Sequence, residues 1–413
     1  MHILLIHQAF ASLDEAGGTR HYEMAQCLAQ QGHRITVLCS PLNYLTGKGR
    51  EARYWVKREQ PENGITMLRT YVYPALHKSF LHRLINFFSF MVSSFLVGLS
   101  VREVDAVWGT SPPIFQGITA WLLARLKGAK FLFEVRDLWP EFAIAVGVLR
   151  NPILIRLSYW LESFLYRHAD QLVVNSPGFI QYVTRWDSRP VELVANGVDT
   201  SMFDPGSDGS GFRKAHGLEH VFVALYAGAH GLSNDLDVIL RAADQLKHRT
   251  DIRFVLVGDG KEKANLQRKA QEMGLENLDF LPPVPKNQMA EVLAGMDAGI
   301  AILKPLEMYK TTYPNKVFDY MAAGRPVVLA IDGVIREVVE QAKAGMFVTP
   351  GDPLAMAEAV AWLADHRDEA RRQGLAGRKA VENRFERRDQ AQKMVLLFQK
   401  MVEPGVSLER RNG

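Results

Sequence analysis

Short apolar runs alternate with segments of helical spacing along most of this chain, and this alternation constrains the fold more than any other feature. The runs are long enough for buried strands, and the segments between them repeat apolar residues every three or four positions, as amphipathic helices do. Strands that alternate with helices indicate parallel sheets with right-handed crossovers. The expected strands are Ile3–Ile6, Ile35–Leu38, Asp105–Trp108, Lys130–Val135, Gln171–Asn175, Phe222–Tyr226, Ile252–Val257, Leu278–Leu281, Ala298–Leu303 and Pro326–Ala330.

The composition of the chain changes between Val191 and Gly211. This stretch, VELVANGVDTSMFDPGSDGSG, passes from a short strand to a run rich in glycine, serine and aspartate, which is typical of a linker. With 413 residues, the chain is also too long for one ordinary hydrophobic core. We therefore expect an α/β protein of two Rossmann-like domains, residues 1–190 and 191–385, whose parallel sheets face a central cleft.

Composition argues against several classes of protein. A hydrophobic content of 47% with 23% charged residues is typical of a folded soluble protein. Two isolated cysteines, Cys27 and Cys39, are too few for a disulfide framework or a zinc site, which favours the cytoplasm. The first residues, MHILLIHQAF, lack the pattern of a signal peptide and are interpreted as a buried strand. The net charge of +4 favours anionic lipid or a phosphorylated substrate over nucleic acid.

One segment, Phe80–Ser100, is long and apolar enough for a membrane span to be considered. His82 and Arg83 interrupt its first turns, and no second hydrophobic span exists to pair with it. We interpret it as a helix that covers the sheet and dips exposed aromatic residues into a membrane surface, aided by His77, Lys78, His82 and Arg83. The alternatives are a fully buried core helix and a true span.

The stretch Tyr313–Val328, YPNKVFDYMAAGRPVV, predicts a short helix between two strands of a parallel sheet. Its helix start then lies at the carboxyl end of the sheet, where free amides bind anions. Asn315 and Lys316 stand there to meet phosphate, and Asp319 follows one turn later to meet sugar hydroxyls. The alternative is a solvated helix start with Asp319 as a surface acid.

Three more loops follow the carboxyl ends of strands in the second half. After Tyr226 the small residues Gly228 and Gly231 let a diphosphate approach main-chain amides, and His230 is placed to donate a hydrogen bond. Lys261 adds a cation at a helix start, and Leu281 begins an apolar shelf for a flat base. Together with the stretch at 313–328, these loops predict a pocket for a nucleoside diphosphate.

Two loops in the first half are further candidates. Gly17 and Gly18 precede a helix, where the backbone comes close to a phosphate or a sugar, although a turn that needs glycine for its geometry is the alternative. Arg136 and Asp137 end the apolar run of EVRDLWPE, at the edge where such sheets bind ligands. The alternative there is a simple ion pair between the two. No nucleophile, metal cluster or triad accompanies these residues, so we expect electrostatic stabilisation of a leaving diphosphate and no metal.

Five motifs carry a resemblance to a known family. They are GGTRHYEMAQCLAQQGHRITVL at 17–38, FEVRDLWPE at 133–141, NGVDTSMFDP at 196–205, VGDGKEK at 257–263 and YPNKVFDYMAAGRPV at 313–327. The chain resembles family 4 retaining glycosyltransferases of the GT-B class, and among them the O-antigen and capsule aminosugar transferases related to fucosaminyltransferase.

The resemblance implies a nucleotide-sugar donor in the carboxyl domain, an acceptor against the amino domain and a final helix, 386–413, that crosses back to the first domain. Asp319 matches the second acid of the family's pair of glutamates, which looks like the ribose ligand, while Thr311 stands where the first acid is expected. The cations that commonly grip the diphosphate are absent after Gly228, which leaves Lys316 and Lys261 as replacements. Arg136 stands where a histidine is often found.

We therefore expect an enzyme that transfers a sugar, N-acetylated in this branch, from a UDP donor with retention. The expected acceptor is a polyprenyl-diphosphate-linked or growing glycan of surface polysaccharide biosynthesis, at the inner face of the cytoplasmic membrane. Gly17 and Gly18 would border the transferred sugar, and Arg136 or Asp137 would orient it or the acceptor. Two alternatives remain open: a sugar-nucleotide 2-epimerase, and a non-catalytic sugar-nucleotide-binding protein.

Overall fold

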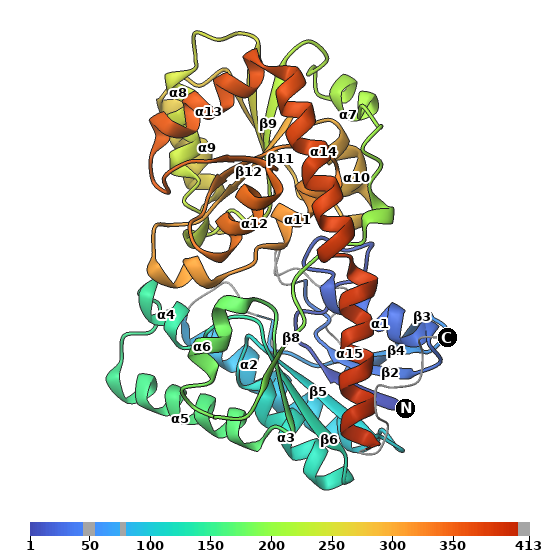
Figure 1. Ribbon diagram of the computed structural model, residues 1–413. Coiled ribbons are helices and arrows are strands. Elements are labelled where there is room, and N and C mark those ends of the chain that lie inside the picture. The colour runs from blue at the N-terminus through green and yellow to red at the C-terminus, as the bar shows by residue number, and fades with distance from the viewer. Residues whose placement is uncertain (44–53, 75–79, 404–413) are drawn as a thin grey trace. The chain divides into compact units, whose positions relative to one another are not determined.

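The computed structural model describes residues 1–43, 54–74 and 80–403, and the chain divides into two compact units (Figure 1). Unit 1 comprises Met1–Ser12, Gly18–Ala195 and the chain from Arg388 onward, and unit 2 comprises Leu13–Gly17 and Asn196–Arg387. The sequence predicted these boundaries at 190/191 and 385/386. His77 and Lys78, predicted to assist a membrane-surface helix, lie outside the described residues.

Unit 1 is built on an eight-stranded sheet in the order β3-β4-β2-β1-β5-β6-β7-β8. Its neighbouring strands are parallel except β3 and β4, which pair antiparallel at one edge. In the centre, Ile3 of β1 lies opposite Ile35 of β2 and Ala106 of β5. The strands are β1 (His2–Ile6), β2 (Arg34–Cys39), β3 (Val56–Glu62), β4 (Ile65–Thr70), β5 (Ala106–Ser111), β6 (Lys130–Val135), β7 (Gln171–Val174) and β8 (Val191–Leu193).

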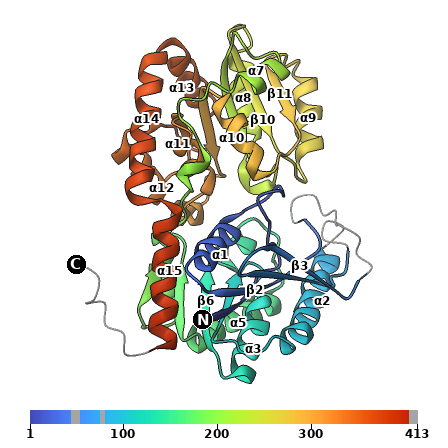
Figure 2. The same ribbon diagram turned by 90° about the vertical axis from the view of Figure 1, so that its right-hand side faces the viewer.

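Helices cover both faces of this sheet: α2, α3 and α5 lie on one face, and α1 and α15 lie on the other (Figures 1 and 2). Leu4 and Ile6 of β1 join the core beneath α2, α3 and α5, whereas Ile3 and Leu5 are equally buried on the opposite face. Burial on both faces explains why β1 is a continuous apolar run. The helices are α1 (Arg20–Gln30), α2 (Phe80–Leu99), α3 (Gln116–Lys127), α4 (Glu141–Ala145), α5 (Pro152–His168), η1 (Pro177–Phe179), α6 (Ile180–Val183) and α15 (Arg387–Val402).

Unit 2 is built on a six-stranded sheet in the order β11-β10-β9-β12-β13-β14, with parallel neighbours throughout. Its own core includes the fully buried side chains of Tyr226, Phe254 and Ile300. The strands are β9 (Phe222–Ala227), β10 (Ile252–Val257), β11 (Leu278–Leu281), β12 (Ala298–Ile302), β13 (Val327–Ala330) and β14 (Gly345–Phe347). The helices are η2 (Thr200–Met202), α7 (Ser210–Ala215), η3 (Leu232–Asn234), α8 (Asp237–Gln245), α9 (Lys263–Glu272), α10 (Lys286–Ala294), η4 (Glu307–Thr311), α11 (Asn315–Ala322), α12 (Val334–Ala342), α13 (Pro353–Asp365) and α14 (Arg367–Arg384).

The largely parallel sheet of unit 1 and the parallel sheet of unit 2 confirm the α/β fold class predicted from the alternation of strands and helices. The hairpin of β3 and β4 was not predicted. The sequence of β3, VKREQPE, is mostly exposed, because this edge strand pairs on one side only and buries little. A strand of this kind lacks the apolar run on which the prediction relied.

Candidate functional site

The loops after β9, β10 and β11 meet at the carboxyl edge of the unit 2 sheet. These strands are parallel neighbours, so their ends lie together. Main-chain hydrogen bonds tie the loops to one another: the amide of Gly228 donates to Val257 O at 2.9 Å, that of His230 to Asp259 O at 2.8 Å, and that of Gly258 to Leu281 O at 3.2 Å. The structure thus brings together the predicted residues Gly228, His230 and Leu281.

Glycine is required at two of these positions. A Cβ on Gly258 would overlap the carbonyl oxygen of Gly228, and a Cβ on Gly228 would lie 2.8 Å from Lys316 Nζ. Both residues also have a φ near +150°, which side chains rarely allow. The two loops therefore approach each other closely, and their main chain stands next to the Lys316 ammonium group.

Lys316 lies on the first turn of α11, half-buried, with Nζ 3.8 Å from the centroid of the Tyr226 ring. Burial lowers the pKa of Lys316 to about 7. Within the described residues no carboxylate pairs with this ammonium group, so its charge is held over an aromatic face without an anion. Such a group is suited to receive a phosphate oxygen.

His230 is fully buried, and neither ring nitrogen has a hydrogen-bond partner among the described residues. Burial, followed by the charges of Lys263 and Lys316, lowers the pKa of His230 to about 4, so the ring is neutral at pH 7. A neutral imidazole carries one donor and one acceptor, and leaving both unused in the interior is costly. The ring of His230 therefore has room for a hydrogen bond to a bound polar group.

Lys263 was not predicted, yet it lies at these loops, while Lys261 is an exposed residue. Lys263 Nζ donates to the carbonyl oxygens of Gly258, at 2.7 Å, and Leu281, at 3.0 Å. Its sequence signal was the second lysine of VGDGKEK. The donor role of Lys261 stays a prediction.

Asp319 is paired with a residue that the sequence analysis did not select. Lys286 Nζ lies 2.7 Å from Asp319 Oδ1, and both side chains are mostly buried.

One turn before Asp319, Asn315 Oδ1 is buried without a partner in the described part of the chain. Thr311, at the position where an acid was expected, donates its hydroxyl to Met308 O. Gly231 accepts a hydrogen bond from the amide of Asn234 in the turn η3.

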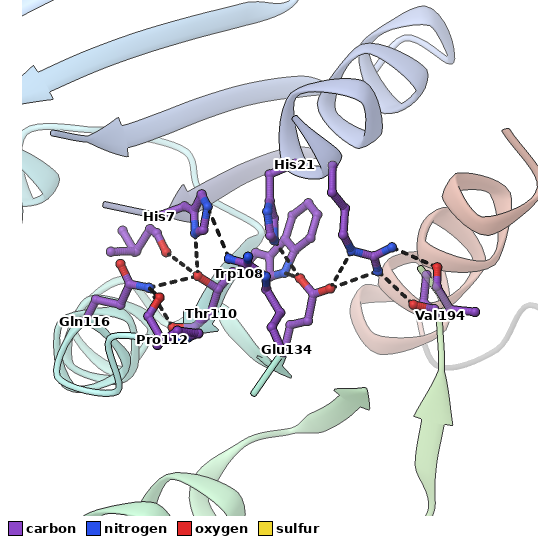
Figure 3. A network of polar contacts seen from close by, with 12 residues as sticks. His7, His21, Trp108, Thr110, Pro112, Gln116, Glu134 and Val194 are labelled. Carbon is purple, nitrogen blue, oxygen red and sulfur yellow. Dashed lines mark hydrogen bonds and ion pairs between the residues drawn. The ribbon is translucent and has the colours of Figure 1, made fainter. Parts of the chain in front are cut away.

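A polar network in unit 1 surrounds the end of β1 (Figure 3). His7 Nδ1 lies 2.8 Å from Thr110 Oγ1, and His7 Nε2 lies 3.3 Å from Arg136 Nη1. Burial, with the nearby His21 and Arg136, lowers the pKa of His7 well below its usual value. An arginine only donates, so His7 accepts through Nε2 and donates from Nδ1 to Thr110. His7 follows a predicted strand directly, as Arg136 does, and the same rule would have found it.

Glu134 is the centre of the second half of this network (Figure 3). Its carboxylate accepts hydrogen bonds from Arg20, His21 Nε2 at 2.8 Å and Trp108 Nε1 at 3.1 Å. Burial acts to raise the pKa of Glu134, but Arg20 and His21 outweigh it and hold that pKa below its usual range. Arg20 also donates to the carbonyl oxygens of Val194 and Ala195. This cluster fixes α1 to the sheet and supports His21, whose ring centroid lies 4.1 Å from that of His7.

The remaining predicted residues of the first half lie at loop positions. Burial raises the pKa of Asp137 to about 6, although the charge of Arg136 opposes this, and Arg136 Nε is buried without a partner among the described residues. Gly17 groups with unit 2 and Gly18 with unit 1. In the described residues, no group of three or more acidic, histidine or cysteine side chains is placed to hold a metal ion.

Two family models match the chain, one in its first half and one in its second half. Residues 16–199 match the glycosyl transferase 4-like domain, and residues 221–366 match the glycosyl transferases of group 1. The chain belongs to the family 4 glycosyltransferases. Its relationship to the fucosaminyltransferase branch stays a prediction.

Relatives of this chain are also named as glycosyltransferases. It is 26% identical over 322 residues to WcaI of Escherichia coli (strain K12), named as a colanic acid biosynthesis glycosyl transferase, across 75% of this chain and 78% of the relative. It is 32% identical over 220 residues to a D-inositol 3-phosphate glycosyltransferase of Nocardioides sp., where it spans about half of the relative, 47%.

Solved structures confirm the GT-B fold of the glycosyltransferase. Sucrose-phosphate synthase from Thermosynechococcus elongatus is similar with a TM-score of 0.75 at 18% identity, over 97% of this chain and 98% of that one. HepE from Anabaena, solved with UDP-glucose, is similar with a TM-score of 0.72 at 16% identity, over 97% and 100%. At these identities the likeness establishes the architecture alone.

Proposed function

We propose that this glycosyltransferase moves a sugar from a UDP-sugar onto a lipid-linked or growing glycan acceptor, with retention of anomeric configuration, in surface polysaccharide biosynthesis. The observation that carries the proposal is a pair of groups in unit 2 that lack partners among the described residues: the buried ring of His230 and the ammonium group of Lys316. They lie beside loops whose glycines leave the main chain uncovered by side chains. A diphosphate supplies the acceptor oxygens that both groups need.

Each donor residue has a role in this proposal. Lys316 and His230 bind the diphosphate, Asn315 adds its amide at the helix start, and Asp319 binds the ribose hydroxyls in exchange for part of its contact with Lys286. Leu281 borders the base. In the transfer, the bond between the anomeric carbon and the diphosphate oxygen breaks, and the charge that develops on UDP is stabilised by Lys316 and by main-chain amides.

On the acceptor side, the proposal uses Arg136, Asp137 and Gly18 of unit 1 and Gly17 of unit 2. Arg136, held by His7, and Asp137 orient the acceptor or the transferred sugar, and Gly17 and Gly18 border that sugar. The expected acceptor is a polyprenyl-diphosphate-linked glycan at the inner face of the cytoplasmic membrane, and the expected donor sugar is N-acetylated. Support for a glycan pathway comes from the names of relatives, among them colanic acid biosynthesis, and support for UDP from the UDP-glucose complex of HepE.

The test has a binding stage and a reaction stage. Calorimetry with UDP, GDP and ADP should give the tightest binding for UDP, and Lys316→Ala should weaken it while Lys214→Ala, an exposed lysine of α7, should not. UDP release is then measured with a panel of UDP-sugars and polyprenyl-diphosphate-linked acceptors, and NMR of the product assigns the anomeric configuration. Full transfer activity in Lys316→Ala would falsify the diphosphate assignment.

A second candidate function is a non-catalytic sugar-nucleotide-binding protein. It is favoured by Thr311, which occupies the position of an expected acid and donates its hydroxyl hydrogen bond to Met308 O. Tight UDP binding with no turnover across the whole panel of donors and acceptors would support this candidate. Formation of an epimer from a UDP-sugar alone would instead indicate a 2-epimerase.

A further inference from the structure

The outward side of α2 is a continuous apolar stripe. Large apolar side chains recur there at helical spacing and are exposed, with Leu81 64% and Val92 51% accessible; the stripe consists of Leu81, Ile85, Phe88, Val92, Leu96 and Leu99. In the described residues, Leu81–Leu99 is the one helical window long and apolar enough to cross a membrane, and only 33% of it is buried. A core helix of a soluble protein would hide most of this surface.

The inward side of α2 packs Phe90 and Val97 into the core of unit 1, and its buried polar side chains hold the helix to neighbouring loops by hydrogen bonds. Asn86 Nδ2 donates to Tyr73 O at 2.6 Å, and Asn86 Oδ1 accepts from Gln8 Nε2 at 2.7 Å. Ser93 donates to Tyr71 O at 2.6 Å. Removing the helix from unit 1 to span a bilayer would break these buried hydrogen bonds and leave their partners unsatisfied. The helix is therefore suited to lie along a membrane surface and not across it.

The helices α3 and α5 extend the same face. They lie in one layer with α2 (Figure 2), α3 packing against both neighbours. The outward side of α5 exposes Ile153, Leu157 and Trp160, the last with 63% of its surface accessible, and α3 exposes Leu126. The apolar surface is thus shared by three helices, which is far more than the isolated apolar residues of an ordinary protein surface.

The charged side chains that these three helices expose are all basic. Their basic residues are Arg83, Arg125, Lys127, Arg156 and Arg167, and their single acidic residue, Glu162, is fully buried. The whole chain, by contrast, is nearly balanced, with 49 basic and 45 acidic residues. Apolar residues interspersed with cations and without exposed acids match the interface of a bilayer that contains anionic lipid.

We propose that the outward face of α2, α3 and α5 is a docking surface for an anionic lipid bilayer, with the helices lying in the plane of the interface. This surface deepens the location given under the proposed function, but it does not depend on the transfer reaction. It holds unit 1 at the membrane where a lipid-linked acceptor is embedded.

Flotation of the purified protein with vesicles tests the surface. We expect binding to vesicles of phosphatidylcholine with phosphatidylglycerol, and at least about tenfold less binding to phosphatidylcholine alone. The triple variant Leu81→Gln, Val92→Gln, Trp160→Gln and the charge variant Arg125→Glu, Arg156→Glu should each lose binding at least about tenfold. UDP affinity and thermal unfolding of the variants, measured in parallel, show that they are folded.

Matched controls come from unit 2. Leu354→Gln with Leu375→Gln removes similarly exposed leucines, and Arg371→Glu with Lys379→Glu reverses exposed charges; neither pair should change flotation. Unchanged flotation of the α2–α5 variants would overturn the proposal. So would a dimer that the same variants abolish, without vesicle binding, because a second copy would then be the occupant. Transfer activity without vesicle binding would contradict the membrane-docking proposal but not the proposed function.

Discussion

We expect Lys316 to make the binding of the donor nucleotide depend on pH. Its pKa is about 7 in the free protein because burial disfavours the charge, and an arriving diphosphate would favour the charge and raise that pKa. Binding therefore takes up a proton above pH 7. We expect the affinity for UDP to fall by up to about tenfold per pH unit above pH 7. Calorimetry from pH 7 to 9, where the terminal phosphate of UDP is already ionised, measures this dependence.

Two variants separate Lys316 from other causes of that dependence. Lys316→Arg keeps its charge throughout the range and should flatten the profile, whereas Lys316→Ala should lose about 1.5–3 kcal/mol of UDP binding at pH 7. Lys214→Ala should reproduce the profile of the natural protein. A steep decline that persists in Lys316→Arg would assign the titration to another group.

His7 is expected to act through Arg136. Its Nε2 is the acceptor that holds Arg136 Nη1, and removing it takes away the partner of a partly buried donor. We expect His7→Ala to lower kcat/KM for the acceptor by about tenfold, or ~1.4 kcal/mol, and to leave the Kd for UDP unchanged. Steady-state kinetics with varied acceptor and calorimetry with UDP measure the two quantities.

The conservative variant decides how His7 acts. His7→Gln retains an oxygen that accepts from Arg136 and should recover part of the lost kcat/KM. Equal loss in both variants, together with weaker UDP binding, would show that His7 supports unit 1 as a whole. Loss of UDP binding is not expected from this side chain, since Lys316 and His230, the residues proposed to bind the diphosphate, belong to unit 2.

The sequence could nominate site residues only through their position after a strand. That rule selected His230, in the loop after β9, and Lys316, on the first turn of α11, and the structure places them near each other. It chose Lys261 over Lys263 because sequence position does not say which of two lysines near a helix start turns toward the loops. The pairing of Lys286 with Asp319 joins residues far apart in the chain, and no local pattern encodes such a contact.

The turn that follows β10 sets how closely the loops after β9 and β10, which are proposed to bind the donor, approach each other. A Cβ on Gly258 would overlap the carbonyl oxygen of Gly228, and its φ of +149° is unfavourable for a side chain. Gly258→Ala must therefore push the two loops apart. We expect at least about tenfold weaker UDP binding and a loss of roughly 1–3 kcal/mol in stability, measured by calorimetry and denaturant unfolding.

Gly18→Ala is the matched control for that turn. No heavy atom lies within 4 Å of a Cβ built on Gly18, and UDP lacks the transferred sugar that Gly18 is proposed to border, so stability and UDP affinity should stay as in the natural protein. If Gly258→Ala behaved like Gly18→Ala, the close approach of the two loops would not matter for the donor.

At the same scale, the strands show what could be predicted and why. The central strands bury both faces, so they are continuous apolar runs, and β1, β9 and β10 begin and end within a residue or two of the expected positions. The edge strand β3 is largely exposed and was missed. Helix α2 was assigned correctly as a helix, but whether its apolar stripe is buried depends on packing, which the sequence alone does not determine.

At the scale of the molecule, each unit has its own hydrophobic core, and unit 1 holds a buried acid that makes its stability depend on pH. Burial raises the pKa of Glu162 to about 8, although hydrogen bonds from Tyr166 and Tyr182 oppose this. The folded state therefore binds a proton more tightly than the unfolded state. Stability from this group is fully present below pH 4.5 and is lost as the pH rises to about 8, by at most about 1.4 kcal/mol per pH unit.

Because each unit has its own core, we expect the two units to unfold in separate transitions, one sensitive to Glu162→Gln and the other to UDP. Glu162→Gln is neutral and should remove the decline between pH 5 and 8 from the transition of unit 1, while UDP should raise only the transition of unit 2, where it binds. Calorimetric scans at pH 6 and pH 8, each with and without UDP, resolve the four cases. Because a ligand stabilises only the cooperative unit that it binds, a single transition that both Glu162→Gln and UDP shift together would contradict this prediction and show that the units unfold as one.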